Sequence, residues 1–437
     1  MERIDISDQK SVTGIEKYSF SGAFRKETTM SRNSFTEVTY KSWFSRIGEA
    51  FKGILVGLVF VIAALALLFW NEGRSVKRYK TLEEGGGVVV SVTSDRVEAA
   101  NDGNLIHVTG RAETDAILTD PVFGVSVPAL KLKRVVEMYQ WKETSRSETQ
   151  KEVGGGTRTV ETYSYSRIWS DQPIHSGDFS EPAGHQNPGA MPYESLEQIA
   201  DHVSLGAFTL PDFLLDKIQN FEPLPAGAET LLPESLKNRA RLYDAGFYLG
   251  PNPASPQIGD TRITFRVARP TEVSVIARQM NRTFEEYPTS AGGAIALLQT
   301  GIHTADAMIQ SAQSSNKIMA WMLRFVGFIL MLIGLNLVLK PLSVLADMLP
   351  VLGNVVGAGS GVISFLLAGI LSLLTIGIAW VVYRPVLGII LILAAAALTM
   401  AIRGKLKSAN PGPLPVNAHG SFREVRPPEL KRMKDEG

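Results

Sequence analysis

The 437-residue sequence contains no cysteine. Disulfide bonds, thiolate nucleophiles, iron–sulfur ligation and cysteine-built zinc sites are therefore excluded. None of the six histidines is spaced four residues from another, so the helical zinc motif that uses such a pair is also missing. We therefore predict no metal site and no cofactor.

The sequence also lacks an excess of either charge. It has 44 basic and 43 acidic residues, a formal net charge of +1. A nucleic-acid-binding protein needs a basic surface to neutralise phosphates. We therefore expect no nucleic-acid partner.

No catalytic motif is present. The glycine clusters at 85–87 and 154–156 lack the lysine and serine of a phosphate-binding loop, and the serine-hydrolase motif Gly-x-Ser-x-Gly is absent. His185, beside Asn187, is the most site-like histidine, but isolated histidines more often serve the fold. We predict no catalytic residues and no enzyme activity.

What the sequence does have is long apolar runs. Gly53 to Trp70 contains no charged residue and, at about 1.5 Å per residue, covers about 27 Å, close to the hydrocarbon thickness of a bilayer. Three later runs have similar lengths. We predict four transmembrane helices, at residues 51–71, 318–339, 362–383 and 385–402.

Residues 341–361 are apolar but are interrupted by Pro350 and several glycines. We interpret this segment as interfacial or re-entrant, with a fifth span as the alternative. The polar residues 1–50 and 403–437 have no periodicity, which indicates disordered tails. An even number of spans places both tails on one side of the membrane, and Arg403, Lys405 and Lys407 favour the cytoplasm.

The region between the first two spans, residues 72–317, has a different pattern. Short strand-like runs alternate with turn residues, and 130–141 and 157–169 flank Gly154-Gly155-Gly156, which predicts a long β-hairpin. Residues 211–221 and the stretch from Gly292 onward have helical patterns. We expect a β-rich α+β extramembrane domain that ends in a helix.

Polar and small residues inside the apolar segments are the candidate site residues. Arg324, Asn336 and Asp347 are polar groups at membrane depth or beside it, where they snorkel, pair or hydrogen-bond between helices. Gly53 and Gly57, and likewise Gly353, Gly357 and Gly361, repeat at four-residue spacing, which allows close helix packing or oligomerisation. Lipid-facing glycine is an equally good interpretation. An Arg324–Asp347 pair is disfavoured, because the two residues lie toward opposite ends of one span.

Several short motifs resemble the transmembrane protein 43 family, also called LUMA, and they occur in the family's order between about residues 69 and 402. The most specific are Val136-Glu137-Met138-Tyr139-Gln140-Trp141 and Tyr383-Arg384-Pro385. The others are Phe69-Trp70-Asn71-Glu72-Gly73-Arg74, Asp120-Pro121-Val122-Phe123-Gly124-Val125, Pro128-Ala129-Leu130-Lys131-Leu132, Asn187 with Ala190-Met191, Gly259-Asp260, Val275-Ile276-Ala277-Arg278-Gln279, Gly334-Leu335-Asn336-Leu337 and Leu373-Leu374-Thr375. The two tails do not match.

The resemblance implies a four-span, non-enzymatic scaffold that self-associates and organises membrane protein complexes. Its partners would be the lipid bilayer, copies of itself and other membrane proteins. In a eukaryote, the protein would lie in the endoplasmic reticulum or inner nuclear membrane, with its large domain in the lumen. In a bacterium, it would lie in the inner membrane, with its large domain in the periplasm. The alternative function is a channel or transporter subunit, favoured by Arg324, Asn336 and the broken 341–361 segment.

Overall fold

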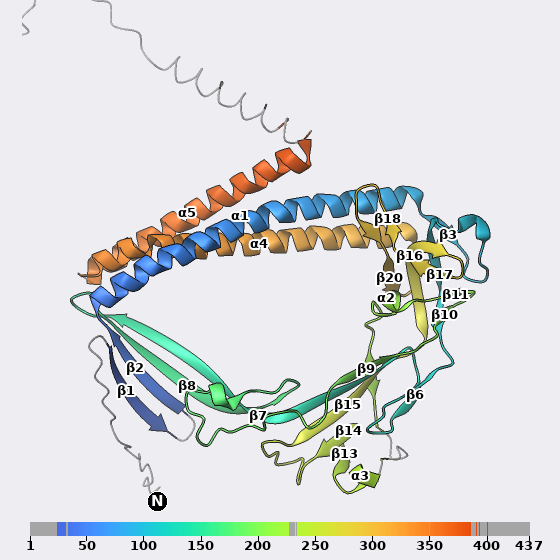
Figure 1. The fold of residues 1–437 in the computed structure, drawn as a ribbon, viewed down its shortest axis with the longest axis horizontal. Helices are drawn as coiled ribbons and strands as arrows, with labels where there is room; N and C mark the ends of the chain where they lie inside the picture. Colours follow the sequence, from blue (N-terminus) through green and yellow to red (C-terminus); the bar gives the residue numbers. More distant parts are fainter. Residues whose placement is uncertain are drawn as a thin grey trace, which may run out of the picture. The chain divides into compact units, whose positions relative to one another are not determined.

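The structure is a computed structural model that describes residues 24–31, 34–226, 232, 234–348 and 350–385, with single residues 390, 393 and 400. Three long helices stand out in Figure 1: α1 (Trp43–Val88), α4 (Ala305–Ala346) and α5 (Pro350–Tyr383). By length and apolarity, each could cross a membrane. Residues up to Ala379 form one compact unit, and those from Trp380 onward form another.

Capping residues mark where α1 and α4 begin. The Ser42 side chain accepts a hydrogen bond from the Ser45 amide at the start of α1, and Thr304 does the same for Ala307 at the start of α4. Each cap satisfies one of the amides that a helix start leaves without an intrahelical partner. Pro341 lies inside the last turns of α4.

A nine-stranded antiparallel sheet, called sheet A, makes up one side of the β-rich region. Along its main path the strands run in the order β1-β2-β8-β7-β15-β14-β13, with β9 paired to β7 and β12 paired to β15. The bounds are β1 (Phe24–Ser31), β2 (Ser34–Lys41), β7 (Lys131–Lys151), β8 (Thr157–Ser170), β9 (Leu196–Ile199), β12 (Glu222–Leu224), β13 (Ala240–Tyr243), β14 (Gly246–Leu249) and β15 (Thr261–Ala268).

A second sheet of seven strands, sheet B, joins the β-rich region to the helices. Its main path is β11-β10-β4-β16-β17, with β20 on β16 and β3 parallel to β4. The bounds are β3 (Val90–Val92), β4 (Leu105–Glu113), β10 (Ser204–Leu205), β11 (Phe208–Thr209), β16 (Thr271–Met280), β17 (Thr283–Glu285) and β20 (Leu297–Thr300). The smaller elements are the pairs β5 (Ile117–Thr119) with β6 (Ser126–Pro128) and β18 (Tyr287–Pro288) with β19 (Ala294–Ile295), and the short helices α2 (Asp212–Leu215) and α3 (Glu234–Lys237).

Three apolar clusters hold these elements together. The largest contains Val108 of sheet B, Val136 and Phe265 of sheet A, and residues of the loops around them. The second packs Leu82 of α1 and Met308 of α4 against Leu105 of sheet B and its neighbours. The third joins the three helices through Ala64, Met331 and Ala368. The helices α1 and α4 and the two large sheets therefore belong to one packed unit.

The β-hairpin predicted around the three glycines is confirmed, because β7 and β8 pair in register from Met138–Ser170 to Lys151–Thr157. Gly154 and Gly155 have φ values of 91° and 81°, a left-handed backbone that glycine adopts without strain. The predicted class of membrane protein with a large β-rich domain is consistent with the structure.

Other boundaries differ from the predictions. The structure describes three apolar helices rather than four; the predicted span 385–402 and tail 403–437 lie almost entirely outside the described residues. Polar turns extend α1 and α4 beyond the predicted 51–71 and 318–339, since hydropathy detects only the apolar part of a helix. Residues 341–361 are not one segment, but are divided between the end of α4 and the start of α5.

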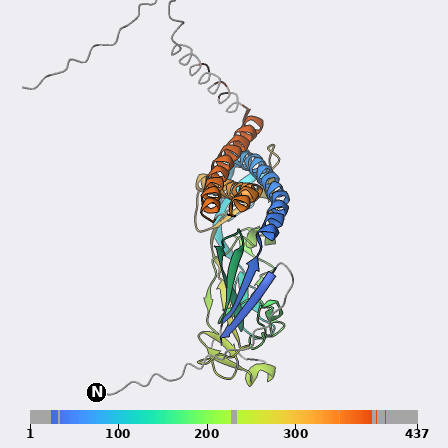
Figure 2. The same ribbon diagram turned by 90° about the vertical axis from the view of Figure 1, so that its left-hand side faces the viewer.

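The N-terminal segment differs most. The sequence predicts a disordered tail over residues 1–50, of which 1–23, 32 and 33 lie outside the described residues. Instead, β2 pairs with β8 over eight residues, from Ser34–Ser164 to Lys41–Thr157. Figure 2 shows β1 and β2 beside this hairpin. The partner strand β8 lies more than 100 positions away in the sequence, so the residues around β2 do not indicate this contact. The expected helix over 211–221 shortens to α2, and the stretch after Gly292 first forms β19 and β20.

Candidate functional site: the helix pair and its two anchored ends

A buried ion pair joins α1 to α4 just past the apolar run of α1. Arg324 donates two hydrogen bonds to Glu72, from Nε to Oε1 at 2.6 Å and from Nη2 to Oε2 at 2.8 Å. The Glu72 side chain is 1% exposed and that of Arg324 is 17% exposed. The Arg324 guanidinium also lies 4.8 Å from the centroid of the Trp321 ring. This bidentate geometry is the strongest form of carboxylate pairing.

Further hydrogen bonds continue this polar layer for one turn. Asn71 Nδ2 donates to the Ala320 carbonyl at 3.0 Å, and Asn316 Nδ2 donates to the Ser75 carbonyl at 2.9 Å. Both asparagines are buried. Hydrogen bonds from side-chain amides to backbone carbonyls of a neighbouring helix fix the register of two helices as well as their separation. The Phe69–Arg74 motif of the sequence thus lies where α1 and α4 lock together.

Small residues bring the apolar parts of the same helices into contact. A Cβ atom added at Gly57 would lie 2.6 Å from the Gly334 carbonyl oxygen, whereas at Gly53 the nearest atom, the Leu337 carbonyl oxygen, is 3.9 Å away. At Gly357 the nearest atom is Ser343 Oγ, at 3.0 Å, and at Gly361 the space is open. The predicted glycines therefore do not form one shared face. Gly353 lies in α5, and Asn336 is exposed on α4.

Asp347 anchors the first end of the helix pair. Its carboxylate is 1% exposed and pairs with Arg46 near the start of α1 and, at 2.7 Å, with Lys151 at the tip of the β7–β8 hairpin. The Arg46 guanidinium also donates to the Gly155 carbonyl, and Trp43 Nε1 donates to the Val344 carbonyl at 2.8 Å. One carboxylate therefore ties together both helices and the hairpin. Arg324 and Asp347 have different partners, Glu72 for the first and Arg46 and Lys151 for the second.

The second end is anchored to β19 and to the turn between β18 and β19. Arg78 Nη1 donates to the Ala294 carbonyl at 2.9 Å, and the Glu84 carboxylate accepts hydrogen bonds from the amide and hydroxyl of Ser290. Buried Thr81 meets Thr289 through their hydroxyls, 3.2 Å apart. These contacts lie on the far side of the apolar run from Asp347.

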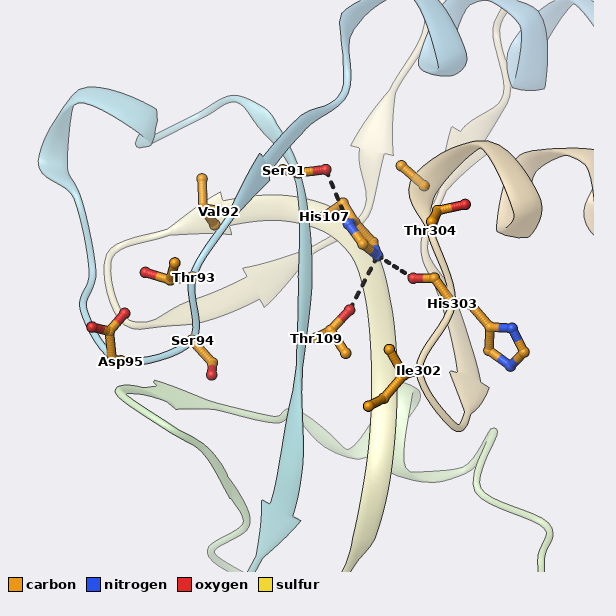
Figure 3. A pocket seen from close by; sticks show the side chains of 11 residues that line it. Ser91, Val92, Thr93, Ser94, Asp95, His107, Thr109, Ile302, His303 and Thr304 are labelled. Carbon is orange, nitrogen blue, oxygen red and sulfur yellow. Dashed lines mark hydrogen bonds between the residues drawn. The ribbon is translucent and has the colours of Figure 1, made fainter.

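A cavity of about 660 Å³ opens between β3, β4 and the segment before α4 (Figure 3). His107 lies in its wall and is 7% exposed. Its Nδ1 lies 3.1 Å from Ser91 Oγ, and its Nε2 lies 2.9 Å from the His303 carbonyl oxygen. A proton on Nε2 satisfies both contacts, with Ser91 as donor to Nδ1.

Burial lowers the pKa of His107, and its hydrogen bond to the His303 carbonyl partly opposes this change. The imidazole is therefore neutral at neutral pH. The hydroxyl of Ser274 extends the network by donating to the Gly301 carbonyl at 2.9 Å and accepting from the His303 amide. His107 thus fixes the chain where it turns from sheet B into α4.

His185, the most site-like histidine in the sequence, lies in the loop between β8 and β9 and packs against sheet A. Its ring stacks on Tyr165 with centroids 3.8 Å apart and meets Trp141 edge-on. Its Nδ1 lies 3.1 Å from the Glu181 carbonyl oxygen. Among the residues that the structure describes, no three His, Asp or Glu side chains are placed to hold a metal ion.

Sequence reasoning identified Arg324, Asp347 and Gly57 but missed Glu72, Arg46 and Lys151, which complete the ion pairs. Glu72 lies two residues after the apolar run that ends at Trp70, a position at which the sequence predicts a solvent-exposed side chain. Its burial depends on α4, which lies about 250 residues away in the sequence. Only a charge inside the predicted span, at Arg324, indicated that a buried partner was needed.

Comparison with known proteins agrees with the motifs now placed on this helix pair and on sheet A. The model of the family described as Transmembrane protein 43 matches residues 138–385. Rat Transmembrane protein 43 is 36% identical over 82% of this chain and 92% of its own length, and the human protein is 35% identical over the same shares. The Transmembrane protein 43 homolog of Drosophila melanogaster is 30% identical over 78% of this chain and 92% of its own. No solved structure matches. The chain belongs to the transmembrane protein 43 family.

Proposed function

We propose that the protein is a non-enzymatic membrane scaffold, which self-associates and organises membrane protein complexes. One observation carries this proposal: the apolar helix pair is fixed to the β-rich region at both of its ends. A transporter needs elements that move against each other around a central site. Because the helix pair is held at both ends, its surfaces keep fixed positions, which suits a scaffold that binds other proteins.

The end strand β13 of sheet A offers a surface for self-association. Leu242 and Tyr243 are each 49% exposed on this strand. Along the main path of the sheet, β13 is the last strand, paired with β14. Strands at a sheet edge pair readily with another chain when apolar side chains accompany them.

The test is chemical crosslinking of the full-length protein in membranes, with a lysine variant at this strand. We expect a defined oligomer in the native protein and less of it in Leu242→Lys. Val153→Lys is the matched control, because Val153 is 91% exposed at the hairpin tip, away from β13. Equal oligomer in all three proteins would move the contact elsewhere, and monomer alone would contradict self-association.

The alternative function, a channel or transporter subunit, draws support from the polar groups within α4. The bidentate pairing of Arg324 with Glu72 argues against this function, because the guanidinium binds a carboxylate of the protein itself. Reconstitution into liposomes separates the two functions, since a scaffold gives no ion flux above that of empty vesicles. Proximity labelling in the native membrane would identify the organised proteins, and would decide between a lumenal and a periplasmic setting for the β-rich domain.

A further inference from the structure

The helix α1 carries a cluster of positive charge just beyond its apolar run. The run ends at Trp70, and Arg74, Lys77 and Arg78 follow within eight residues. Lys77 and Arg78 lie three and four positions after Arg74, so all three side chains leave the helix on one side. We call these three residues the basic face.

The basic face has no acidic partner within the protein. Glu72 is the only acidic residue between Trp70 and Glu83, and its carboxylate is paired with Arg324. In the described part of the chain, no residue of the basic face forms a salt bridge. Its positive charge is therefore available to an external anion.

Two buried asparagines orient the Arg74 guanidinium. Its Nη1 donates to Asn316 Oδ1 at 3.2 Å, and its Nη2 donates to Asn71 Oδ1 at 3.4 Å. The amide nitrogens of both asparagines bond to the backbone of the opposite helix, so their oxygens are held in place. These oxygens position the guanidinium without neutralising it, and each Nη nitrogen keeps a second N–H. Nε is buried and has no hydrogen-bond partner among the described residues.

The other two cations lie beside the turn between β18 and β19. Arg78 Nη1 donates to the Ala294 carbonyl at 2.9 Å. A Cβ atom added at Gly292 would lie 3.5 Å from Lys77 Nζ, so the ammonium group adjoins a part of the turn that has no side chain. Lys77 itself is exposed. The basic face is thus bordered by α4 and by this turn.

The position of the basic face along α1 matches the head-group layer of a membrane. Trp70 is 56% exposed, and tryptophan is enriched at the membrane–water interface. Arg74 and Arg78 lie about 6 Å and about 12 Å beyond Trp70 along the helix axis, whereas the head-group layer is about 5–8 Å thick on each side. Side chains lean toward the N-terminus of their helix, which for α1 is toward the apolar run.

The surface that adjoins the basic face is apolar. Ile62 of α1 and Met322 of α4 are each 58% exposed, and Met319 is 47% exposed. A free anion would contact only the cations, whereas a ligand with an anionic head and an apolar tail contacts both surfaces. A guanidinium also matches the geometry of phosphate oxygens. These properties together identify an anionic phospholipid.

We infer that the basic face binds the phosphate head group of an anionic phospholipid in the leaflet next to the β-rich region. Arg74 is the phosphate ligand, and Lys77 and Arg78 supply further positive charge beside it. The lipid compensates the one guanidinium that the contact between α1 and α4 leaves without a carboxylate. Binding of this kind goes beyond a scaffold role, because it makes the helix pair selective for the composition of its membrane.

Native mass spectrometry of the full-length protein tests this inference by counting bound lipids. Phosphatidylglycerol and phosphatidylcholine are titrated separately, and we expect the first phosphatidylglycerol to bind more tightly than the first phosphatidylcholine. Arg74→Gln should weaken phosphatidylglycerol binding about fivefold and leave phosphatidylcholine binding unchanged. Lys77→Gln should have a similar effect, and because Lys77 is exposed, this variant cannot act by disturbing the contact between α1 and α4.

The matched control is Lys317→Gln, which removes one charge at the same depth. Lys317 is exposed and follows Asn316 directly, but it lies seven positions before Arg324 and so shares the face of α4 that carries Arg324. We expect its phosphatidylglycerol affinity to equal that of the native protein. If Arg74→Gln and Lys77→Gln bind phosphatidylglycerol as tightly as Lys317→Gln does, the inference is overturned.

Inorganic phosphate distinguishes a lipid site from a site for a soluble anion. Phosphatidylglycerol binding is measured with inorganic phosphate present and again with chloride at the same ionic strength. We expect equal affinities in the two salts, because phosphate lacks the acyl chains that contact the apolar surface. Displacement of phosphatidylglycerol by inorganic phosphate but not by chloride would overturn the assignment to a lipid.

Discussion

At the scale of single residues, this protein concentrates its buried charge at contacts between distant segments. Glu72 with Arg324 and Asp347 with Arg46 and Lys151 join parts of the chain that lie some 200 to 300 positions apart. Removing a cation from such a contact weakens the compensation of a buried carboxylate, which costs more than the pair contributes.

We predict that Arg324→Leu destabilises the full-length protein by about 3 kcal/mol, because it removes the bidentate cationic partner of the buried Glu72 carboxylate. The double variant Glu72→Leu with Arg324→Leu should regain most of this loss. Unfolding in detergent micelles, followed by intrinsic fluorescence, measures both.

The control for this cycle is Arg146→Leu, which breaks the exposed pair with Glu148. Its effect should stay within about 0.5 kcal/mol. If Arg324→Leu were as mild as Arg146→Leu, the Glu72–Arg324 pair would not hold the helices together.

A pH dependence follows from His107. Because burial lowers its pKa in the folded protein, the unfolded chain takes up the proton first as the pH falls below the ordinary value of about 6.5. The contribution of His107 to stability is therefore complete above that pH and declines below it. We expect the unfolding midpoint to fall more between about pH 7.5 and about pH 5.5 in the native protein than in His107→Gln. Parallel pH profiles for the two proteins would assign the decline to other groups.

At the scale of elements, the contact between α1 and α4 depends on close backbone approach. Gly57 and Gly334 face each other, and a Cβ at either position would lie within 3 Å of the opposing carbonyl oxygen. Such contacts allow two helices to pack through their backbones rather than through large side chains.

Gly57→Ala should therefore push the helices apart and lower the free energy of unfolding by about 1–3 kcal/mol. Gly53→Ala is the matched control, because its nearest neighbour is 3.9 Å away and alanine favours helix over glycine. The same fluorescence-detected unfolding compares them. A Gly57→Ala protein as stable as Gly53→Ala would show that the helices separate without cost.

At the scale of the whole molecule, β2 covers an edge of the long hairpin that the remaining chain leaves exposed. Removing residues 1–41 should expose the edge of β8 at Thr157–Ser164 that faces away from β7, and exposed strand edges self-associate. We expect larger species by light scattering after size-exclusion chromatography, and a lower melting temperature. Removal of residues 1–23 alone, which leaves β2 in place, should change neither. Identical behaviour of the two shortened proteins would mean that β2 does not protect this edge.

The sequence by itself determined the membrane character, the long apolar helices, the β-rich region and the β7–β8 hairpin. Each has a local cause: an uncharged apolar run, alternating side chains, or glycines at a turn that needs positive φ. Motifs such as Val136–Trp141 also sufficed to identify the family.

Only the tertiary structure decided which residues act together. The pairing of β2 with β8, the burial of Glu72 and the meeting of Arg46, Lys151 and Asp347 each involve segments separated by more than 100 residues. No local periodicity encodes such a contact, because hydropathy records whether a side chain avoids water and not which distant surface covers it.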